Sequence, residues 1–330
     1  MRPPSSTRGI AAAVVALTVL AGAGIGLAQP TGRVYRIGVL EAVPADRNAA
    51  NLDALRRGLR ERGYIEGRNL AIEYRSADGR PERFPALAAE LVRLNVDLIV
   101  TRGTPAARAA QQATATIPTV MATMGDPRSL VASFARPGGN VTGVTTYGTE
   151  LVGKRVELLA ELVPALRRIG LLHNMGNPAA PPEWEETKRA ARALGVQAEL
   201  LDVRSPDDLA RALELAGPPR VDALVVGFDG LTQMHQATIV GLLARRKLPA
   251  VYPAREFVEA GGLMAYAVNY PELYYRFATL IDKILRGAKP AGLPVEQPTR
   301  FELLLNLTAA RELGLTVPPS LMLRVDATIR

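Results

Sequence analysis

The most informative stretch of the sequence is Arg136-Pro137-Gly138-Gly139-Asn140-Val141-Thr142-Gly143. Pro137 restricts φ, and the two glycines that follow accept backbone angles that other residues resist. The β-branched residues after them favour a strand from Val141 to Tyr147. Alone, this is the pattern of an ordinary turn that leads into a strand, so its meaning depends on the sequence on either side.

Short β-branched runs alternate with helical segments before this turn. We predict strands at Arg36–Leu40, Leu70–Tyr74, Asp97–Thr101, Thr119–Thr123 and Val141–Thr146. Helices are predicted between them, at Asn51–Arg62, Phe84–Leu94 and Ala106–Ala113. Because the strand runs are continuously apolar, they indicate burial on both faces, and therefore a parallel sheet between two layers of helices.

The pattern of strands repeats in the second half of the chain. Ile37-Gly38-Val39-Leu40 has a counterpart in Ile169-Gly170-Leu171-Leu172, and two later strands recur at a similar offset of about 130 residues. The alternative is that unrelated βα units share such local patterns. The agreement in strand order and spacing predicts an α/β fold with two similar lobes of about five strands, each a parallel sheet sandwiched by helices.

Three crossings between the lobes are predicted. Val141–Tyr147 leads out of lobe 1, Gly262–Asn269 leads back, and the Pro-rich stretch Lys289–Pro298 is a semi-rigid connector to the C-terminal tail. Helix Tyr270–Arg286 then packs on lobe 1. The predicted boundaries are 34–146 plus 270–298 for lobe 1, and 147–269 plus 299–330 for lobe 2, joined by a hinge.

Several motifs occur in a fixed order along the chain. With Arg136–Gly143 in their middle, they are Gly63-Tyr64-Ile65-Glu66-Gly67-Arg68-Asn69, Gly103-Thr104-Pro105-Ala106-Ala107, Glu259–Tyr266, Leu293–Leu303 and Leu313–Leu321. Together they resemble a large family of bacterial periplasmic substrate-binding proteins of ABC transporters, from about Tyr35 to Arg330. The resemblance implies the type I periplasmic binding-protein fold, and an inner-membrane ABC permease with its ATPase as partner.

The ligand is not settled by the resemblance. Members of the family include tryptophan- and tyrosine-binding proteins, and those carry His-Pro in the loop after the first strand. Here that loop reads Glu41-Ala42-Val43-Pro44-Ala45-Asp46, with the proline but without the histidine. This departure argues against an aromatic amino acid.

The first 28 residues differ from the rest and are predicted to be a cleavable signal peptide. Arg2 and Arg8 precede an apolar run, Ile10–Leu27, and Gly26 and Ala28 are small residues suited to a cut after Ala28. The rival interpretation is a single membrane anchor, because the run is near the minimum length for spanning. With no cysteine, the chain has no lipid-anchoring thiol or disulfide, so we expect a periplasmic protein.

Composition restricts the remaining function classes. The net charge of +8 would suit nucleic acid, but basic residues alternate with acidic ones and form no long run, which is typical of solvated helix faces. His173 and His235 are the only histidines and make a poor metal site. No nucleophile-elbow or dinucleotide-binding motif is present. We therefore expect no nucleic acid, metal, cofactor or catalysis, and a monomer.

Ligands of open parallel sheets bind beyond the carboxyl ends of the strands, and in two lobes these ends face one cleft. The candidate ligand-binding residues are those that follow or end such strands: Glu41, Gly103, Thr104, Asp126, Thr146, Tyr147, Asn174, Asp229, Tyr252, Tyr266 and Asn269.

Two of these candidates carry specific expectations. Thr104 is predicted to be the N-cap of a helix whose free amide groups attract a carboxylate, with Pro105 at the first helical position. Asp229 either holds an ammonium group or caps the helix that begins near Thr232. Ser205 is predicted to be a purely structural cap, because Asp207 and Asp208 already occupy the positive end of its helix.

These observations predict the binding component of an ABC importer, in which the lobes close on a small carboxylate-bearing solute, an amino acid or an organic or aromatic acid. The alternatives are an exported ligand-binding sensor that feeds a signalling partner, and a periplasmic α/β enzyme.

Overall fold

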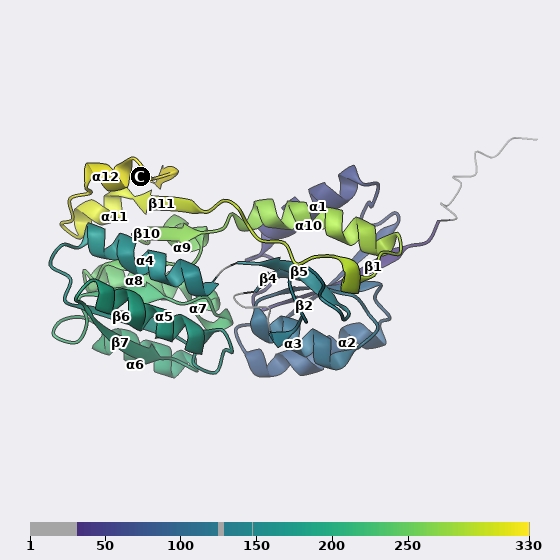
Figure 1. Ribbon diagram of the computed structural model, residues 1–330, viewed down its shortest axis with the longest axis horizontal. Helices are drawn as coiled ribbons and strands as arrows, with labels where there is room; N and C mark the ends of the chain where they lie inside the picture. The colour runs from purple at the N-terminus through teal and green to yellow at the C-terminus, as the bar shows by residue number, and fades with distance from the viewer. Residues whose placement is uncertain (1–31, 125–128, 147, 330) are drawn as a thin grey trace, which may run out of the picture. The chain divides into compact units, whose positions relative to one another are not determined.

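In the computed structural model, residues 32–124, 129–146 and 148–329 are described, and two β-sheets organise them (Figure 1). The predicted signal peptide and the candidates Asp126 and Tyr147 lie outside the described residues. Both sheets belong to one compact unit, Arg33–Arg330.

The first sheet is parallel throughout, with strand order β2-β1-β3-β4-β5. Its strands differ from the predicted ones by one or two residues at most at either end: β1 (Tyr35–Glu41), β2 (Leu70–Ser76), β3 (Leu98–Arg102), β4 (Thr119–Met124) and β5 (Val141–Thr145). Its helices are α1 (Ala49–Glu61), α2 (Phe84–Arg93), α3 (Thr104–Ala113) and, from much later in the chain, α10 (Tyr270–Leu285).

Both faces of this sheet are buried, as its apolar strands predict. Val39 belongs to a cluster that contains Leu55 of α1 and Phe277 of α10, whereas its neighbour Leu40 packs with Leu91 of α2 on the opposite face. Successive side chains of a strand point to opposite faces, so an unbroken apolar run requires a helix layer on each side.

The second sheet is larger than predicted, with strand order β12-β11-β10-β9-β8-β6-β7. The strands are β6 (Arg168–His173), β7 (Gln197–Asp202), β8 (Ala223–Val226), β9 (Ala250–Tyr252), β10 (Met264–Ala267), β11 (Glu302–Asn306) and β12 (Ala327–Ile329). The helices are α4 (Gly148–Leu162), α5 (Ala180–Ala193), α6 (Pro206–Leu215), α7 (Gly230–Met234), α8 (Gln236–Arg245), α9 (Arg255–Glu259), α11 (Leu307–Glu312) and α12 (Pro319–Met322).

The C-terminal tail explains the difference. It adds β11 and β12 to the second sheet. Because β11 runs antiparallel to β10, this sheet is mixed, whereas a parallel sheet was predicted. The chain leaves β10 for α10, which packs against α1, and returns through the Pro-rich connector. The chain leaves the second sheet from the end of β10 and re-enters it at that same end, so β11 must run antiparallel to β10.

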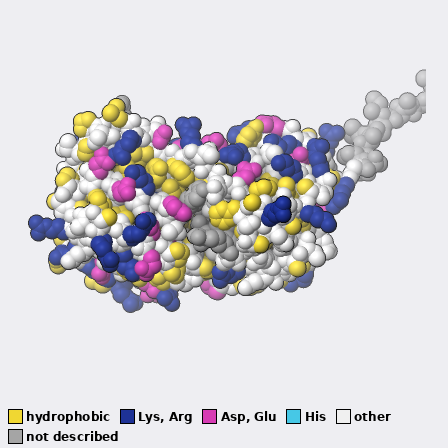
Figure 2. Space-filling view, viewed as in Figure 1, with side chains coloured by type: hydrophobic (Ala, Val, Ile, Leu, Met, Phe, Trp, Pro, Cys, Tyr) yellow, Lys and Arg dark blue, Asp and Glu magenta, His cyan; other side chains and the backbone are white. Residues whose placement is uncertain are grey.

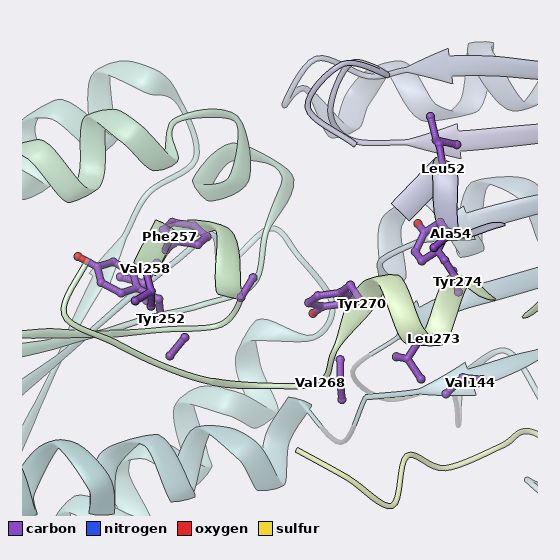
Figure 3. Close-up of a cluster of buried hydrophobic side chains, with 14 of the residues drawn as sticks. Leu52, Ala54, Val144, Tyr252, Phe257, Val258, Val268, Tyr270, Leu273 and Tyr274 are labelled. Atoms are coloured by element: carbon purple, nitrogen blue, oxygen red, sulfur yellow. The ribbon is translucent and has the colours of Figure 1, made fainter. Parts of the chain in front are cut away.

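The first and third crossings lie beside each other. Val144 of β5 forms a parallel bridge with Glu296 of the connector, and the Glu296 N–H donates to the Gly143 carbonyl at 2.8 Å. Around the second crossing, the buried cluster continues from Tyr252 and Phe257 through Val268 and Tyr270 to Leu273 and Tyr274 (Figure 3). Apolar packing therefore runs along the segment that links the sheets.

None of the helices in the described part of the chain is both long and apolar enough to cross a membrane. On the face shown in Figure 2, basic and acidic side chains are interspersed, as the charge pattern of the sequence predicts.

Candidate functional site

A cavity lies where the carboxyl ends of strands from both sheets meet, the place that the parallel topology predicts. The cavity is partly open to solvent. Segments that follow β1, β2, β3, β5, β6, β8, β9 and β10 line it. Its polar lining residues are Glu41, Arg102, Thr104, Thr146, Arg155, Asn177, Glu183, Asp229, Gln233 and Tyr270.

The start of α3 forms one wall of the cavity. Gly103, with φ of 84°, occupies the N-cap position, so Thr104 is the first residue of the helix and Pro105 the second. The prediction of Thr104 as N-cap is therefore wrong by one residue, because only glycine takes this positive φ without strain. No side chain caps α3, and its first amide groups remain available to an anion at the cavity.

Arg155 is a buried cation in the opposite wall. It lies on the buried side of α4, only 3% exposed, and its Nε donates to the Tyr266 carbonyl at 2.9 Å. Among the described residues, no carboxylate lies within ion-pair distance of it. Burial lowers the pKa of Arg155 more than Glu183, Tyr270 and Tyr266 raise it. A buried guanidinium in this position favours an anionic partner, because desolvation of an unpaired charge is expensive.

Glu183 is a buried carboxylate in the same wall, in the first turn of α5. Its Oε2 lies 3.3 Å from Nε2 of the fully buried His173, although the two atoms are not aligned for a hydrogen bond. The Asn174 N–H donates to His173 Nδ1 at 2.8 Å, so a neutral ring carries its proton on Nε2, facing Glu183. Burial lowers the pKa of His173, but Glu183 outweighs it and the net pKa is raised.

Asp229 follows β8 and takes the second of its two predicted roles, since it is the N-cap of α7 in a capping box with Thr232. One oxygen accepts from the Leu231 N–H and the other from Asn177 Nδ2, each at 2.9 Å. Asp229 also lines the cavity. The capping role is confirmed, and contact with a ligand ammonium group stays a prediction.

A polar network in the first sheet ends at the cavity. Asn48 Nδ2 donates to Glu41 Oε1 at 3.1 Å, and Asn48 Oδ1 accepts from Arg102 Nη1 at 3.5 Å. The Tyr274 hydroxyl also donates to Glu41 Oε1. The Arg102 guanidinium lies over the rings of Tyr270 and Phe228, at 4.3 Å and 5.1 Å from their centroids. Arg102 thus reaches the second sheet as well as the first.

Five of the candidates from the sequence line this cavity: Glu41, Gly103, Thr104, Thr146 and Asp229. Asn174 lines a smaller neighbouring pocket together with Asp229. Asn269 instead caps α10 and donates to Glu302 at 2.8 Å.

Two of the candidate tyrosines lie outside the lining of the cavity. Tyr252 is 2% exposed and stacks on Phe257 with ring centroids 5.1 Å apart, in the hydrophobic core (Figure 3). Tyr266 packs against Phe301, and only its carbonyl is connected to the site, through Arg155. Successive side chains of a strand point to opposite faces, so a position at the end of a strand does not by itself show whether the side chain points to the core or to the cavity.

Six polar lining residues are not among the candidates from the sequence: Arg102, Arg155, Asn177, Glu183, Gln233 and Tyr270. A signal existed for two of them, because each is a charged residue at the spacing of the apolar stripe of its helix. Arg155 lies among Val152, Val156 and Leu159 of α4, and Glu183 shares a buried face with Ala180 and Thr187 of α5. Charges are rarely buried without a partner, so such positions point to a site.

The site has no features of a metal centre in the described residues, where no three His, Cys, Asp or Glu side chains cluster closely enough to hold an ion. Its chemistry is that of recognition, with buried cations, buried carboxylates and free helix amides around one space.

Comparisons with known proteins agree with this arrangement. The chain is 26% identical over 263 residues to the tyrosine-binding protein of Clostridioides difficile (strain R20291), covering 78% of this chain and 75% of that protein. The ABC domain from Streptococcus pneumonia, solved in complex with L-Trp, is 30% identical with a TM-score of 0.81, covering 89% of this chain and all 100% of that one. A conserved domain protein from Vibrio cholerae O1 biovar eltor is 28% identical with a TM-score of 0.84, covering 90% and 100%.

A protein-family model described as ABC transporter substrate binding protein matches residues 36–329, nearly the whole described chain. This is a family of binding proteins and not of enzymes. The chain therefore belongs to the ABC transporter substrate-binding protein family and has the type I periplasmic binding-protein fold.

Proposed function

We propose that this protein is the binding component of an ABC importer and captures a small, carboxylate-bearing solute in the cavity between its two sheets. The observation that carries the proposal is Arg155, a buried guanidinium in the cavity wall without a carboxylate partner among the described residues. A ligand carboxylate would supply that partner, and the uncapped start of α3 offers further donors.

An amino acid would suit the remaining charges better than a simple acid would. Glu183 and Asp229 both line the cavity, and either carboxylate could accept a hydrogen bond from an ammonium group. The relatives support an amino acid in general, since one is named a tyrosine-binding protein and another was solved with L-Trp. An organic or aromatic acid would meet only the cationic half of the site.

The proposed partners follow from the family. The protein delivers its solute to an inner-membrane permease with its ATPase, acts as a monomer, and reaches the periplasm through the signal peptide predicted at residues 1–28. In the binding step the lobes close on the solute without making or breaking a covalent bond.

Native mass spectrometry of protein purified gently from the periplasmic fraction tests this function. We expect an added mass that corresponds to a small acid or amino acid and is lost on unfolding. Deletion of the gene should also abolish uptake of that solute by cells. A neutral sugar as the retained mass would contradict the carboxylate proposal, and unchanged uptake would contradict the importer proposal.

A further inference from the structure

Several buried polar atoms beside the cavity have no hydrogen-bond partner in the described part of the chain. They include Oε2 of Glu41 and both Nε and Nη2 of Arg102. Glu41 is 1% exposed and Arg102 is 5% exposed, and both line the cavity. A buried donor or acceptor without a partner destabilises the protein, so unused donors and acceptors that line one cavity indicate a group that completes them.

The two side chains do not satisfy each other. They lie outside ion-pair distance, and the carboxylate nearest to Arg102 is Glu256, 3.9 Å from Nη2. Asn48 holds them apart and in place, because its amide contacts Glu41 with one end and Arg102 with the other. Asn51 in turn donates to Asn48 Oδ1 at 2.8 Å, which fixes the orientation of that amide.

The chemistry of the two orphaned ends is complementary. Arg102 offers only donors, whereas the ionised Glu41 offers only acceptors. A group that bridges them must accept from one and donate to the other, and a hydroxyl does both. A hydroxyl also suits a protonated Glu41, because its oxygen has two lone pairs. A methyl or aromatic C–H leaves all of these atoms without partners, and a bare carbonyl leaves the ionised Glu41 unpaired.

We propose that Glu41 and Arg102, held by Asn48, recognise a hydroxyl group on the bound solute and make the protein select hydroxylated carboxylates over their deoxy counterparts. The inference rests on the proposed function, since Arg155 and the start of α3 would bind the carboxylate while Glu41 and Arg102 bind a hydroxyl group of the same molecule.

Matched probe pairs test the selection by isothermal titration calorimetry: L-tyrosine with L-phenylalanine, 4-hydroxybenzoate with benzoate, and L-serine with L-alanine. For the pair that binds, we expect the hydroxylated member to bind about tenfold to a hundredfold more tightly, the range for a hydrogen bond to a charged group. Equal affinities within each pair that binds would overturn the inference and leave the proposed function intact. If no carboxylate of any kind binds, the proposed function fails first.

Variants assign the selection to these residues. Glu41→Gln and Arg102→Lys should reduce the affinity ratio within a pair to less than about threefold, since each removes a matched acceptor or donor. A merely structural role would weaken both members of a pair equally and leave the ratio unchanged, which would overturn the assignment. Because Arg102→Lys keeps the charge, it remains informative if Glu41→Gln does not fold.

The chain offers a matched control pair. Arg56 of α1 and Glu66, which precedes β2, form an ion pair at 2.7 Å outside the cavity lining. Glu66→Gln and Arg56→Lys change the same functional groups there, and should keep the full wild-type ratio. A ratio reduced equally by the control variants would overturn the assignment to Glu41 and Arg102.

Discussion

Gly143, in the edge strand β5, shows how close contact with a neighbouring strand restricts the choice of residue. Its φ is 144°, and a Cβ at this position would lie 2.1 Å from the Met121 carbonyl oxygen of the neighbouring strand. A Cβ on Gly139, a few residues earlier, would meet no heavy atom within 4 Å. The glycines of this stretch therefore serve different purposes, although the sequence alone presents them as one turn.

Replacement of Gly143 by alanine should destabilise the protein by about 3 kcal/mol, because strain at positive φ adds to the clash with β4. Gly139→Ala, the matched control, should change stability by less than about 0.5 kcal/mol. Urea unfolding followed by circular dichroism measures both. Equal midpoints for the two variants would show that β5 can move away from β4 without cost.

Glu41 gives a pH dependence with a definite sign. Burial raises its pKa above the ordinary value of 4.5, although Arg102, Tyr274 and Asn48 act against this. A raised pKa means that folding favours the protonated acid, so the contribution of Glu41 to stability is complete below its unfolded pKa and declines as the pH rises through its folded pKa.

Wild type should therefore lose thermal stability relative to Glu41→Gln as the pH rises from about 4 to about 8, because glutamine does not titrate. Differential scanning calorimetry of both proteins across this range gives the difference directly. If wild type instead became more stable relative to Glu41→Gln as the pH rises, Arg102 would stabilise the carboxylate by more than burial destabilises it.

Site residues were harder to predict from the sequence than strands, for a physical reason. The ends of β1, β3 and β8 locate Glu41, Gly103, Thr104 and Asp229 at the cavity, because parallel topology brings these ends together. Arg155 and Glu183 come from helix faces, and their orientation depends on packing between α4, α5 and the sheet. The local sequence pattern marks Arg155 and Glu183 as unusual charged residues on buried helix faces, but it does not show that they line the cavity.

At the scale of elements, the contact between α1 and α10 depends on a glycine inside a helix. A Cβ on Gly58 would lie 2.6 Å from the Tyr275 carbonyl oxygen and 2.8 Å from the Ala278 Cβ. Gly241, inside α8, has room, because the nearest atom is Arg245 Nη1 at 3.6 Å. The same substitution should thus have opposite effects in the two helices.

Gly58→Ala should destabilise the protein by about 1–3 kcal/mol through overpacking, whereas Gly241→Ala should stabilise it by about 0.5–1 kcal/mol through helix propensity. Thermal unfolding of the two variants beside wild type measures both. If Gly58→Ala were more stable than wild type, α1 and α10 would be able to move apart slightly without a loss of stability.

The elements themselves could largely be predicted from the sequence. Apolar runs located the strands of the first sheet within one or two residues, since burial on both faces leaves a strong signal. The antiparallel β11 was not predicted because its direction follows from the route of the chain through α10 and the connector. No local pattern of Glu302–Asn306 encodes that route.

At the scale of the whole molecule, the two halves meet at a pair of glycines. A Cβ on Gly230 would lie 2.9 Å from the Ala42 Cβ and 3.9 Å from Gly79, and a Cβ on Gly79 would lie 2.9 Å from the Met234 Cβ. Arg47 also donates to the Met234 carbonyl. The lobe boundaries, 34–146 plus 270–298 and 147–269 plus 299–330, stay a prediction, but close approach here requires small residues.

Gly230→Val should hold the two halves apart and weaken binding of a carboxylate ligand by about tenfold or more, because the closed state is penalised. Small-angle X-ray scattering with saturating ligand should show a larger radius of gyration than for wild type. Gly139→Val serves as the control and should match wild type in both measurements. An unchanged radius and affinity for Gly230→Val would show that this contact does not limit closure.

The central claim, that a carboxylate-bearing solute is held by Arg155 and the start of α3, is tested most directly by a thermal-shift screen of wild type and Arg155→Gln. At a hundredfold excess over Kd, an amino acid or organic acid should raise the wild-type Tm by about 5 °C, since ligand binds only the folded protein. The same compound should raise the Tm of Arg155→Gln by less than about 2 °C. Stabilisation by neutral sugars alone, or an equal shift in both proteins, would contradict the account.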